Sequence, residues 1–212
     1  LNPGELDPAG PVAVIGAGTG LGQAIAFPLS SSAAPRVIVS EGGHTDFAPR
    51  NQTEIELLRF LQQKHDHVSY ERVLSGPGLA ALYEFVLCWG VVSEKPETRA
   101  ALRNKDPGSA IGEPALARTD PACERAVEMF VSIYGAEAGN LALKCLPTGG
   151  LFVAGGIAPR LLDSLRNGGF VQAFLDKGRM RGVLERIRVS VVLAPRVALL
   201  GARAHALQLL SA

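Results

Sequence analysis

A carboxylate and an imidazole lie three residues apart in the segment Glu41-Gly42-Gly43-His44. The two glycines between them permit an irregular backbone from which both side chains can project toward one spot. A carboxylate accepts two hydrogen bonds from hydroxyl groups, and a neutral imidazole offers one donor and one acceptor. Together they can hold the vicinal diol of a sugar, and each charge-assisted bond contributes about 1.5–3 kcal/mol. A metal site is disfavoured, since no second histidine or cysteine stands at ligand spacing near His44. The residues alone leave open a solvated or structural role.

A second chemical feature is the glycine cluster Gly16-Ala17-Gly18-Thr19-Gly20-Leu21-Gly22, which follows a short apolar run at residues 12–15. Dense glycine lets backbone amides approach phosphate oxygens closely. The cluster is not a P-loop, because no Gly-Lys-Ser/Thr closes it. We predict a hairpin that presents amides and the Thr19 hydroxyl to a phosphate. A glycine-rich hairpin without a ligand is the alternative.

A dinucleotide-binding turn is the competing interpretation of this cluster, because Glu41 follows a second predicted strand at about the expected offset. The glycine register argues against it. Counting the Gly-x-Gly-x-x-Gly pattern from Gly16 or from Gly18 places Leu21 or Gln23 where the third glycine should stand. The helix that should follow would have barely two turns before Pro28, too short to return the chain to a parallel strand. A nucleotide-dependent oxidoreductase is therefore a disfavoured alternative function.

The elements that must position these residues follow from hydrophobic periodicity and turn signals. We expect an α/β fold with a mixed sheet flanked by helices, because strands and helices alternate without a strict βαβ pattern. Residues 21–29 read as a strand or a short helix, and residues 92–121 as a surface excursion with one short helix. Small residues in the long helix should let another segment pack close to its backbone. The other predictions are strands at residues 12–15, 36–40, 151–154 and 188–193, a loop at 30–35, and helices at 53–64 (capped by Asn51), from 73 to 89 with a break at 75–78, at 123–143, 159–167 and 198–210.

Composition excludes several classes of protein. The chain has 212 residues, of which 47% are hydrophobic, enough for one substantial core. Its 21 basic and 20 acidic residues give a net charge of +1 without long runs of one sign, which does not favour nucleic acid or an anionic membrane as a partner. The 3 cysteines have no CxxC spacing and are typical of reduced thiols in a cytosolic protein. The longest apolar runs are too short to cross a bilayer, and no secretory signal pattern opens the chain.

Six segments, in order along the chain, resemble the bacterial glucokinase family. The resemblance covers nearly the whole chain and is weakest over residues 90–118. The order of six motifs makes it far more specific than any one glycine pattern. The segments are 16–22 (GAGTGLG), 41–49 (EGGHTDFAP), 67–79 (HVSYERVLSGPGL), 139–143 (GNLAL), 152–160 (FVAGGIAPR) and 174–179 (FLDKGR).

The resemblance implies the two-domain actin-like ATPase (ribonuclease H-like) fold, with sugar and ATP in the cleft between the domains. It implies ATP-dependent phosphorylation of D-glucose to glucose 6-phosphate, the first step of glycolysis, with Mg²⁺ accompanying the nucleotide. A cytoplasmic location and a possible homodimer come with it. We further infer that Asp46 orients the His44 ring. The residues that match the family's site are Glu41, His44 and Glu71 for sugar hydroxyls, Gly18, Thr19 and Gly20 for the second phosphate loop, and Gly155 and Gly156 for the turn beside the adenosine.

Two motifs of the family have no counterpart in this chain, namely an Asp-x-Gly-Gly-Thr phosphate turn and an Asn-Asp pair whose aspartate is the catalytic base. The resemblance therefore implies that residues 1–212 are the large C-terminal domain, that the small N-terminal domain is absent from the chain, and that the catalytic base lies outside it. General-base loss typically costs 10²–10⁴-fold in rate. We accordingly expect this chain alone to bind glucose and ATP weakly and to turn over negligibly. The alternative function is a non-catalytic sugar-binding sensor or regulator built on the kinase fold.

Overall fold

The computed structural model describes residues 1–28, 35–90 and 92–211, so most of the loop predicted at 30–35 lies outside the described residues. A five-stranded mixed sheet has the order β3-β2-β1-β4-β5. The β1–β2 and β2–β3 pairs are antiparallel, and the β1–β4 and β4–β5 pairs are parallel. The predicted α/β class with a mixed sheet is confirmed. The strands are β1 (Val12–Ala17), β2 (Leu21–Phe27), β3 (Arg36–Ser40), β4 (Leu151–Ala154) and β5 (Val189–Val191).

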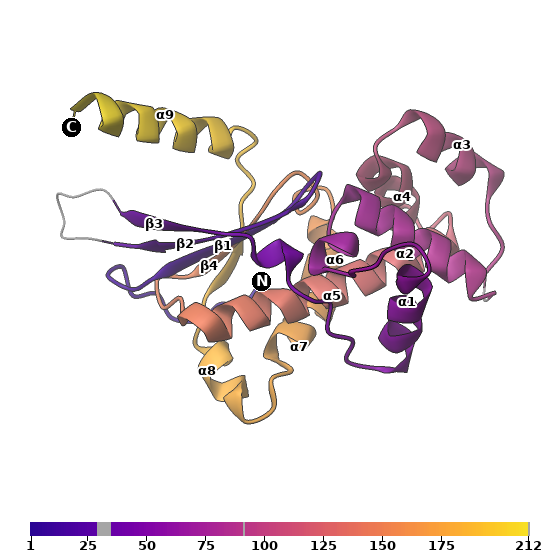
Figure 1. The fold of residues 1–212 in the computed structure, drawn as a ribbon, viewed down its shortest axis with the longest axis horizontal. Helices are drawn as coiled ribbons and strands as arrows, with labels where there is room; N and C mark the ends of the chain where they lie inside the picture. Colours follow the sequence, from indigo (N-terminus) through magenta and orange to yellow (C-terminus); the bar gives the residue numbers. More distant parts are fainter. Residues whose placement is uncertain (29–34, 91, 212) are drawn as a thin grey trace.

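Helices surround the sheet unevenly (Figure 1). Helix α5 runs along one face, with α7 and α8 packed beside it; α1 to α4 gather beyond one end of the strands, and α9 stands on the opposite side of the sheet from α5. None of the helices in the described ranges is both long and apolar enough to cross a membrane. The helices are α1 (Gln52–Gln62), α2 (Gly76–Cys88), α3 (Pro96–Asn104), α4 (Pro107–Leu116), α5 (Pro121–Cys145), α6 (Leu162–Arg166), α7 (Gly169–Leu175), α8 (Arg181–Glu185) and α9 (Val197–Ser211), with short 3₁₀ turns η1 (Gly42–His44), η2 (Tyr70–Arg72) and η3 (Gly178–Met180).

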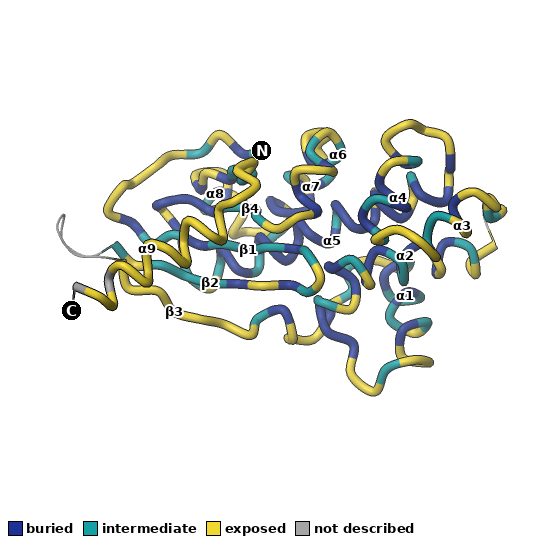
Figure 2. The backbone as a smooth tube through the Cα atoms, turned by 90° about the horizontal axis from the view of Figure 1, so that it is seen from above, coloured by how far each residue is buried: buried dark blue, intermediate teal, exposed yellow. Residues whose placement is uncertain are grey.

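The long helix α5 is the centre of the core, and Figure 2 shows most of its length buried. Its small residues do permit a close approach, since a side chain at Gly135 would overlap the backbone carbonyl of Phe170 on α7. The preceding residue, Tyr134, is fully buried and packs edge-on against Phe170 with the ring centres 5.8 Å apart. Its hydroxyl accepts a hydrogen bond from the Ala17 amide at 3.1 Å, at the end of β1. Helix α5 thereby fixes the end of β1, which contains the first residues of the glycine cluster.

The predicted break at residues 75–78 is wrong, because these residues begin helix α2. The Ser75 hydroxyl accepts a hydrogen bond from the Gly78 amide at 3.0 Å, which makes Ser75 the N-cap. Pro77 sits in the first turn, where its missing N–H costs no helical hydrogen bond. A serine, a proline and two glycines at this point mark a helix start.

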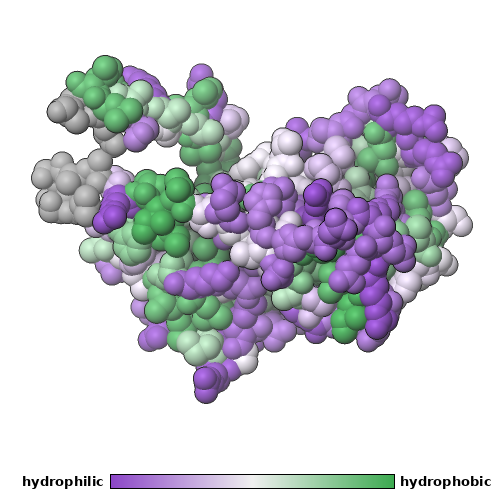
Figure 3. Space-filling model, in the orientation of Figure 1, coloured by the Kyte–Doolittle hydropathy of each residue, from purple (hydrophilic) through white to green (hydrophobic). Residues whose placement is uncertain are grey.

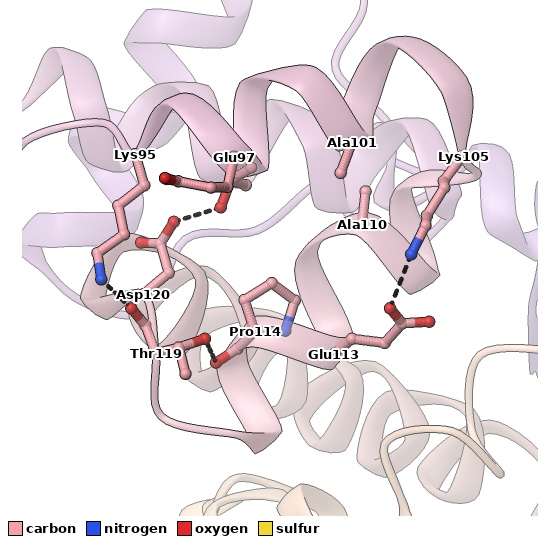
Figure 4. Close-up of a pocket in the computed structure, with 10 residues that line it drawn as sticks. Lys95, Glu97, Ala101, Lys105, Ala110, Glu113, Pro114, Thr119 and Asp120 are labelled. Atoms are coloured by element: carbon pink, nitrogen blue, oxygen red, sulfur yellow. Dashed lines mark hydrogen bonds and ion pairs between the residues drawn. The ribbon is translucent and has the colours of Figure 1, made fainter.

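The prediction of a surface excursion at residues 92–121 is also wrong. The segment contains two helices, α3 and α4, and buries Thr98 and Ile111. A cavity of about 310 Å³ lies between α3, α4 and the start of α5 (Figure 4), and its polar side chains largely bond to one another. The Thr98 hydroxyl donates to Asp120 at 2.6 Å, and Lys105 pairs with Glu113 at 3.0 Å. This cavity contains none of the predicted site residues. Helices α7 and α8 were likewise not predicted.

The edge of the sheet formed by strand β3 is open to solvent. All five residues of β3 are exposed, and Val39 keeps 86% of its surface accessible. Figure 3 shows apolar side chains on the surface over β3 and over α9, where Leu199 and Leu209 are each 68% exposed. The candidate site residues lie around the turn that joins β1 to β2 and in the segment that follows the last residue of β3.

The cysteines are free thiols, as predicted, and differ in accessibility. Burial raises the pKa of the Cys123 thiol to about 12 and that of Cys145 to about 11, whereas Cys88 is exposed. Because the thiolate is the reactive form, we expect Cys88 alone to react rapidly with Ellman's reagent at pH 8 in the native protein. All 3 thiols should react in guanidinium chloride. Rapid native labelling of Cys123, located by mass spectrometry, would contradict this packing of α5.

Candidate functional site

The Glu41–His44 pair lies on the 3₁₀ turn η1, with Glu41 as its N-cap residue. The Nε2 atom of His44 is 3.9 Å from Oε2 of Glu41, and both side chains are exposed, by 59% and 93% respectively. The turn packs closely on the start of β2, because a side chain at the buried Gly43 would overlap the carbonyl oxygen of Leu21. The glycine pair thus brings the carboxylate and the imidazole together, as expected, and anchors them to the sheet.

A short antiparallel pairing carries Glu71 to the same place. The Phe47 amide donates to the Val68 carbonyl at 2.9 Å, and the Tyr70 amide donates to the Thr45 carbonyl at 3.0 Å. Glu71 is the middle residue of η2 and lines one pocket with His44. Glu41 is not in the pocket wall, but its carboxylate faces the His44 ring. The pocket has a volume of about 350 Å³ and is lined by His44, Lys64, His65, Asp66, His67, Ser69, Glu71 and Arg72.

Asp46 does not orient His44, so that inference was wrong. Its Oδ1 atom lies 2.8 Å from Nε2 of His67, a residue that we had not singled out. The physical reason is the bridge between Asp46 and Ser69, which faces Asp46 toward the segment that carries His67. The η1 turn is instead fixed by Thr45, whose hydroxyl donates to the Gly42 carbonyl at 2.8 Å.

The glycine cluster forms the predicted hairpin. Ala17 pairs with Leu21 in the antiparallel register of β1 and β2, which leaves residues 18–20 as the turn. The Gly18 amide donates to the Gly20 carbonyl at 2.8 Å, whereas no acceptor in the described part of the chain takes the amides of Thr19 and Gly20. The Thr19 side chain is exposed. Because strand β2 follows the turn directly, the dinucleotide-binding βαβ unit is excluded at this position.

The second glycine turn lies beside this hairpin. Strand β4 runs parallel to β1 with Ala154 opposite Gly16, so Gly155 and Gly156 leave the sheet next to the residues 18–20 turn. The Ile157 amide donates to the Ala17 carbonyl at 3.3 Å, and Gly155 has a φ of +84°, a conformation that favours glycine. Both glycine turns therefore meet at the carboxyl ends of two parallel strands, where ligands of α/β sheets commonly bind.

A buried polar network lies beneath the turns η1 and η2, and it was not predicted from the sequence. Glu137 on α5 is fully buried and accepts hydrogen bonds from Gln23 at 2.8 Å and from Asn140 at 2.9 Å. Asn140 also donates to the Tyr70 hydroxyl at 3.0 Å and accepts from Lys177 at 2.7 Å. Burial lowers the pKa of the Lys177 ammonium group. The network joins the segments 139–143 and 174–179 through the Lys177–Asn140 hydrogen bond. Both segments contributed to the family resemblance, but no site role was assigned to either of them.

The network also reaches the turns that hold the candidate ligands. Gln23 lies directly beneath η1, because a side chain at Gly42 would overlap its amide oxygen. Tyr70, which accepts from Asn140 of the network, is the residue before Glu71.

Within the described ranges, no three histidine, cysteine or acidic side chains gather closely enough to hold a metal ion.

Comparisons with known proteins agree on one family. A family model described as Glucokinase matches residues 1–209. A glucokinase of Nostoc punctiforme is 46% identical over 215 residues, which cover 95% of this chain and 62% of that protein. The chain therefore spans somewhat less than two thirds of this relative's length.

Two solved structures have a similar fold. A glucokinase from an Antarctic psychrotroph superposes with a TM-score of 0.81 at 33% identity, covering 95% of this chain and 59% of that one. A ROK family glucokinase from Streptomyces griseus, solved in complex with glucose and AMPPNP, superposes with a TM-score of 0.57 at 22% identity, covering 87% and 56%. The second likeness concerns the fold alone.

Proposed function

The chain belongs to the glucokinase family, and from that premise we propose that the whole protein transfers the γ-phosphoryl group of ATP to D-glucose and forms glucose 6-phosphate. One observation carries the proposal: the pocket that joins His44 and Glu71, with Glu41 beside it, lies next to a hairpin whose Thr19 and Gly20 amides have no acceptor among the described residues. Phosphoryl transfer depends mainly on positioning and on electrostatic stabilisation, so a sugar pocket beside a phosphate turn suits that chemistry.

In this proposal three side chains hold the sugar. Glu41 and Glu71 accept hydrogen bonds from hydroxyl groups, and His44 both donates and accepts. A pocket of about 350 Å³ falls within the usual size range of small-molecule sites. The exposure of Glu41 and His44 leaves both side chains accessible to a sugar that enters from solvent.

The nucleotide lies on the glycine side of the site. Gly18, Thr19 and Gly20 offer amides and a hydroxyl to its phosphates, and the turn of Gly155 and Gly156 flanks its adenosine. Mg²⁺ typically keeps several waters and binds through substrate phosphates with one or two carboxylates. The described residues offer no closed cage for it, so we propose that Mg²⁺ arrives with ATP and neutralises phosphate charge there.

We further propose that residues 1–212 form the large domain of the kinase, and we assign no catalytic base within them. A cytoplasmic location and a homodimer are part of the same proposal and rest on the family alone.

Calorimetry and a coupled assay on the whole gene product test the proposed function. We expect binding of glucose and of AMP-PNP, and formation of glucose 6-phosphate when ATP and Mg²⁺ are supplied. Glucose binding without any product would instead identify a non-catalytic sugar sensor. Binding of NAD without binding of glucose would overturn the proposal entirely.

A further inference from the structure

We propose that Glu71 is a positioning residue for the phosphate hairpin as well as a sugar ligand, so that sugar and nucleotide binding are coupled through its carboxylate. One oxygen holds the hairpin, and the other remains available to a sugar hydroxyl. The inference rests on the proposed function and adds a physical link between its two halves.

The contact lies at the end of the turn. The Leu21 amide donates a hydrogen bond to Oε2 of Glu71 at 2.9 Å, immediately after the glycine turn. Glycine at position 20 makes room for this carboxylate, because a side chain there would overlap Oε2. The other oxygen, Oε1, would lie 3.9 Å from that side chain and is directed away from the turn. The two oxygens of Glu71 thus have different surroundings.

The same stretch of chain also holds the beginning of the turn. The Gly76 amide, at the start of α2, donates to the Gly18 carbonyl at 2.8 Å. Between these two contacts the Ser75 hydroxyl donates to the Glu71 carbonyl at 2.7 Å, which fixes η2 against the helix start. The hairpin turn is therefore clamped at both ends by residues 71–76. A shift of Glu71 toward or away from a sugar would therefore move the turn through this hydrogen bond.

Coupling between two sites is reciprocal, and it commonly changes affinity by roughly 5- to 150-fold. We expect saturating glucose to raise the affinity of the whole gene product for AMP-PNP within that range. Saturating AMP-PNP should raise the affinity for glucose by the same factor. Calorimetric titrations of each ligand, alone and with the other present, measure both factors.

Two neighbouring glycines provide matched variants. In Gly20→Ala the added methyl group must displace the Glu71 carboxylate, so we expect weaker glucose binding and loss of the coupling. In Gly22→Ala, two residues further along in β2, the same methyl group meets no described atom closer than the Gly16 carbonyl oxygen at 4.0 Å, an ordinary contact. Neither glycine has a positive φ, so alanine fits the backbone at both positions. Because Gly22 has no proposed contact with the sugar or the nucleotide, we expect Gly22→Ala to retain the coupling.

A second pair of variants tests the link without altering the turn. Glu71→Gln keeps an oxygen that can accept from the Leu21 amide, so it should retain part of the coupling, whereas Glu71→Ala should lose it. This pair decides the question if Gly20→Ala does not fold. Equal coupling factors in the wild type, Gly20→Ala and Glu71→Ala would overturn the inference, as would wild-type protein that binds both ligands independently. Failure of the wild type to bind glucose at all would instead overturn the proposed function.

Discussion

Replacing Glu41 with alanine is expected to weaken glucose binding by the whole gene product roughly 10- to 150-fold, because each lost hydrogen bond to a charged group is worth about 1.5–3 kcal/mol. The Glu41 side chain is 93% exposed, and its contact with His44 at 3.9 Å is long for an ion pair. Removing it should therefore change the free energy of unfolding by about 0.5 kcal/mol at most. Calorimetry with glucose and urea denaturation measure the two quantities separately.

Asp66→Ala is the matched control for this experiment. Asp66 is an acidic residue in the wall of the same pocket, but it has no proposed contact with the sugar. We expect its removal to leave glucose affinity within about twofold of the wild type, a free-energy change within the usual ±0.5 kcal/mol of a surface substitution. Glu41→Gln retains an acceptor but loses the charge, so its affinity for glucose should lie between those of Glu41→Ala and Asp66→Ala. If Glu41→Ala and Asp66→Ala bind glucose equally well, Glu41 is not a sugar ligand.

Local patterns in the sequence predicted the parts of the site that are formed within a few residues. The glycine register before Pro28 identified a hairpin and excluded a dinucleotide fold, and β1 and β2 pair antiparallel. The Glu-Gly-Gly-His spacing predicted that two side chains approach one another, and they do. Asn51 was recognised as a helix cap, and its side chain accepts from the Glu54 amide at 2.9 Å. In each case the determining contacts lie within a short stretch of chain.

Contacts between distant segments could not be predicted in this way. The bridge between Asp46 and Ser69 decides that Asp46 faces His67, and no local pattern encodes that pairing. Only one short helix was predicted where α3 and α4 stand, because Pro96 and Pro107, which read as helix breakers, lie in the first helical turns. Proline is well tolerated there, since its missing N–H would have no partner in the helix.

Buried polar groups were the least predictable feature. Glu137 sits in a long helical pattern where a single glutamate usually faces solvent, yet it is fully buried. Only the assembled fold supplies its partners, Gln23 from β2 and Asn140 from the next turn of α5. The motif that contains Asn140 was recognised by resemblance, but its physical task emerged from these contacts.

Removing the Glu137 carboxylate is expected to lower the free energy of unfolding by about 2–6 kcal/mol, since each of two buried amides loses an acceptor at a cost of about 1–3 kcal/mol. Glu137→Ala leaves the Gln23 amide and the Asn140 amide without their acceptor in the interior, and unsatisfied buried groups keep their full desolvation cost. Urea denaturation of the 212-residue chain, followed by circular dichroism, measures the change. Glu137→Gln keeps one acceptor oxygen, so its free energy of unfolding should fall less than that of Glu137→Ala.

Glu128→Ala on the same helix is the control, since among the described residues the exposed Glu128 side chain pairs only with Arg125, at 3.0 Å. Surface ion pairs contribute about 0–1 kcal/mol, so this variant should unfold close to the wild-type midpoint. Equal losses of stability in Glu128→Ala and Glu137→Ala would show that the network contributes nothing beyond a surface charge. Because Gln23 lies beneath η1 and Tyr70 precedes Glu71, we expect Glu137→Gln to weaken glucose binding as well. The network would then stabilise the core and hold the turns η1 and η2 in place.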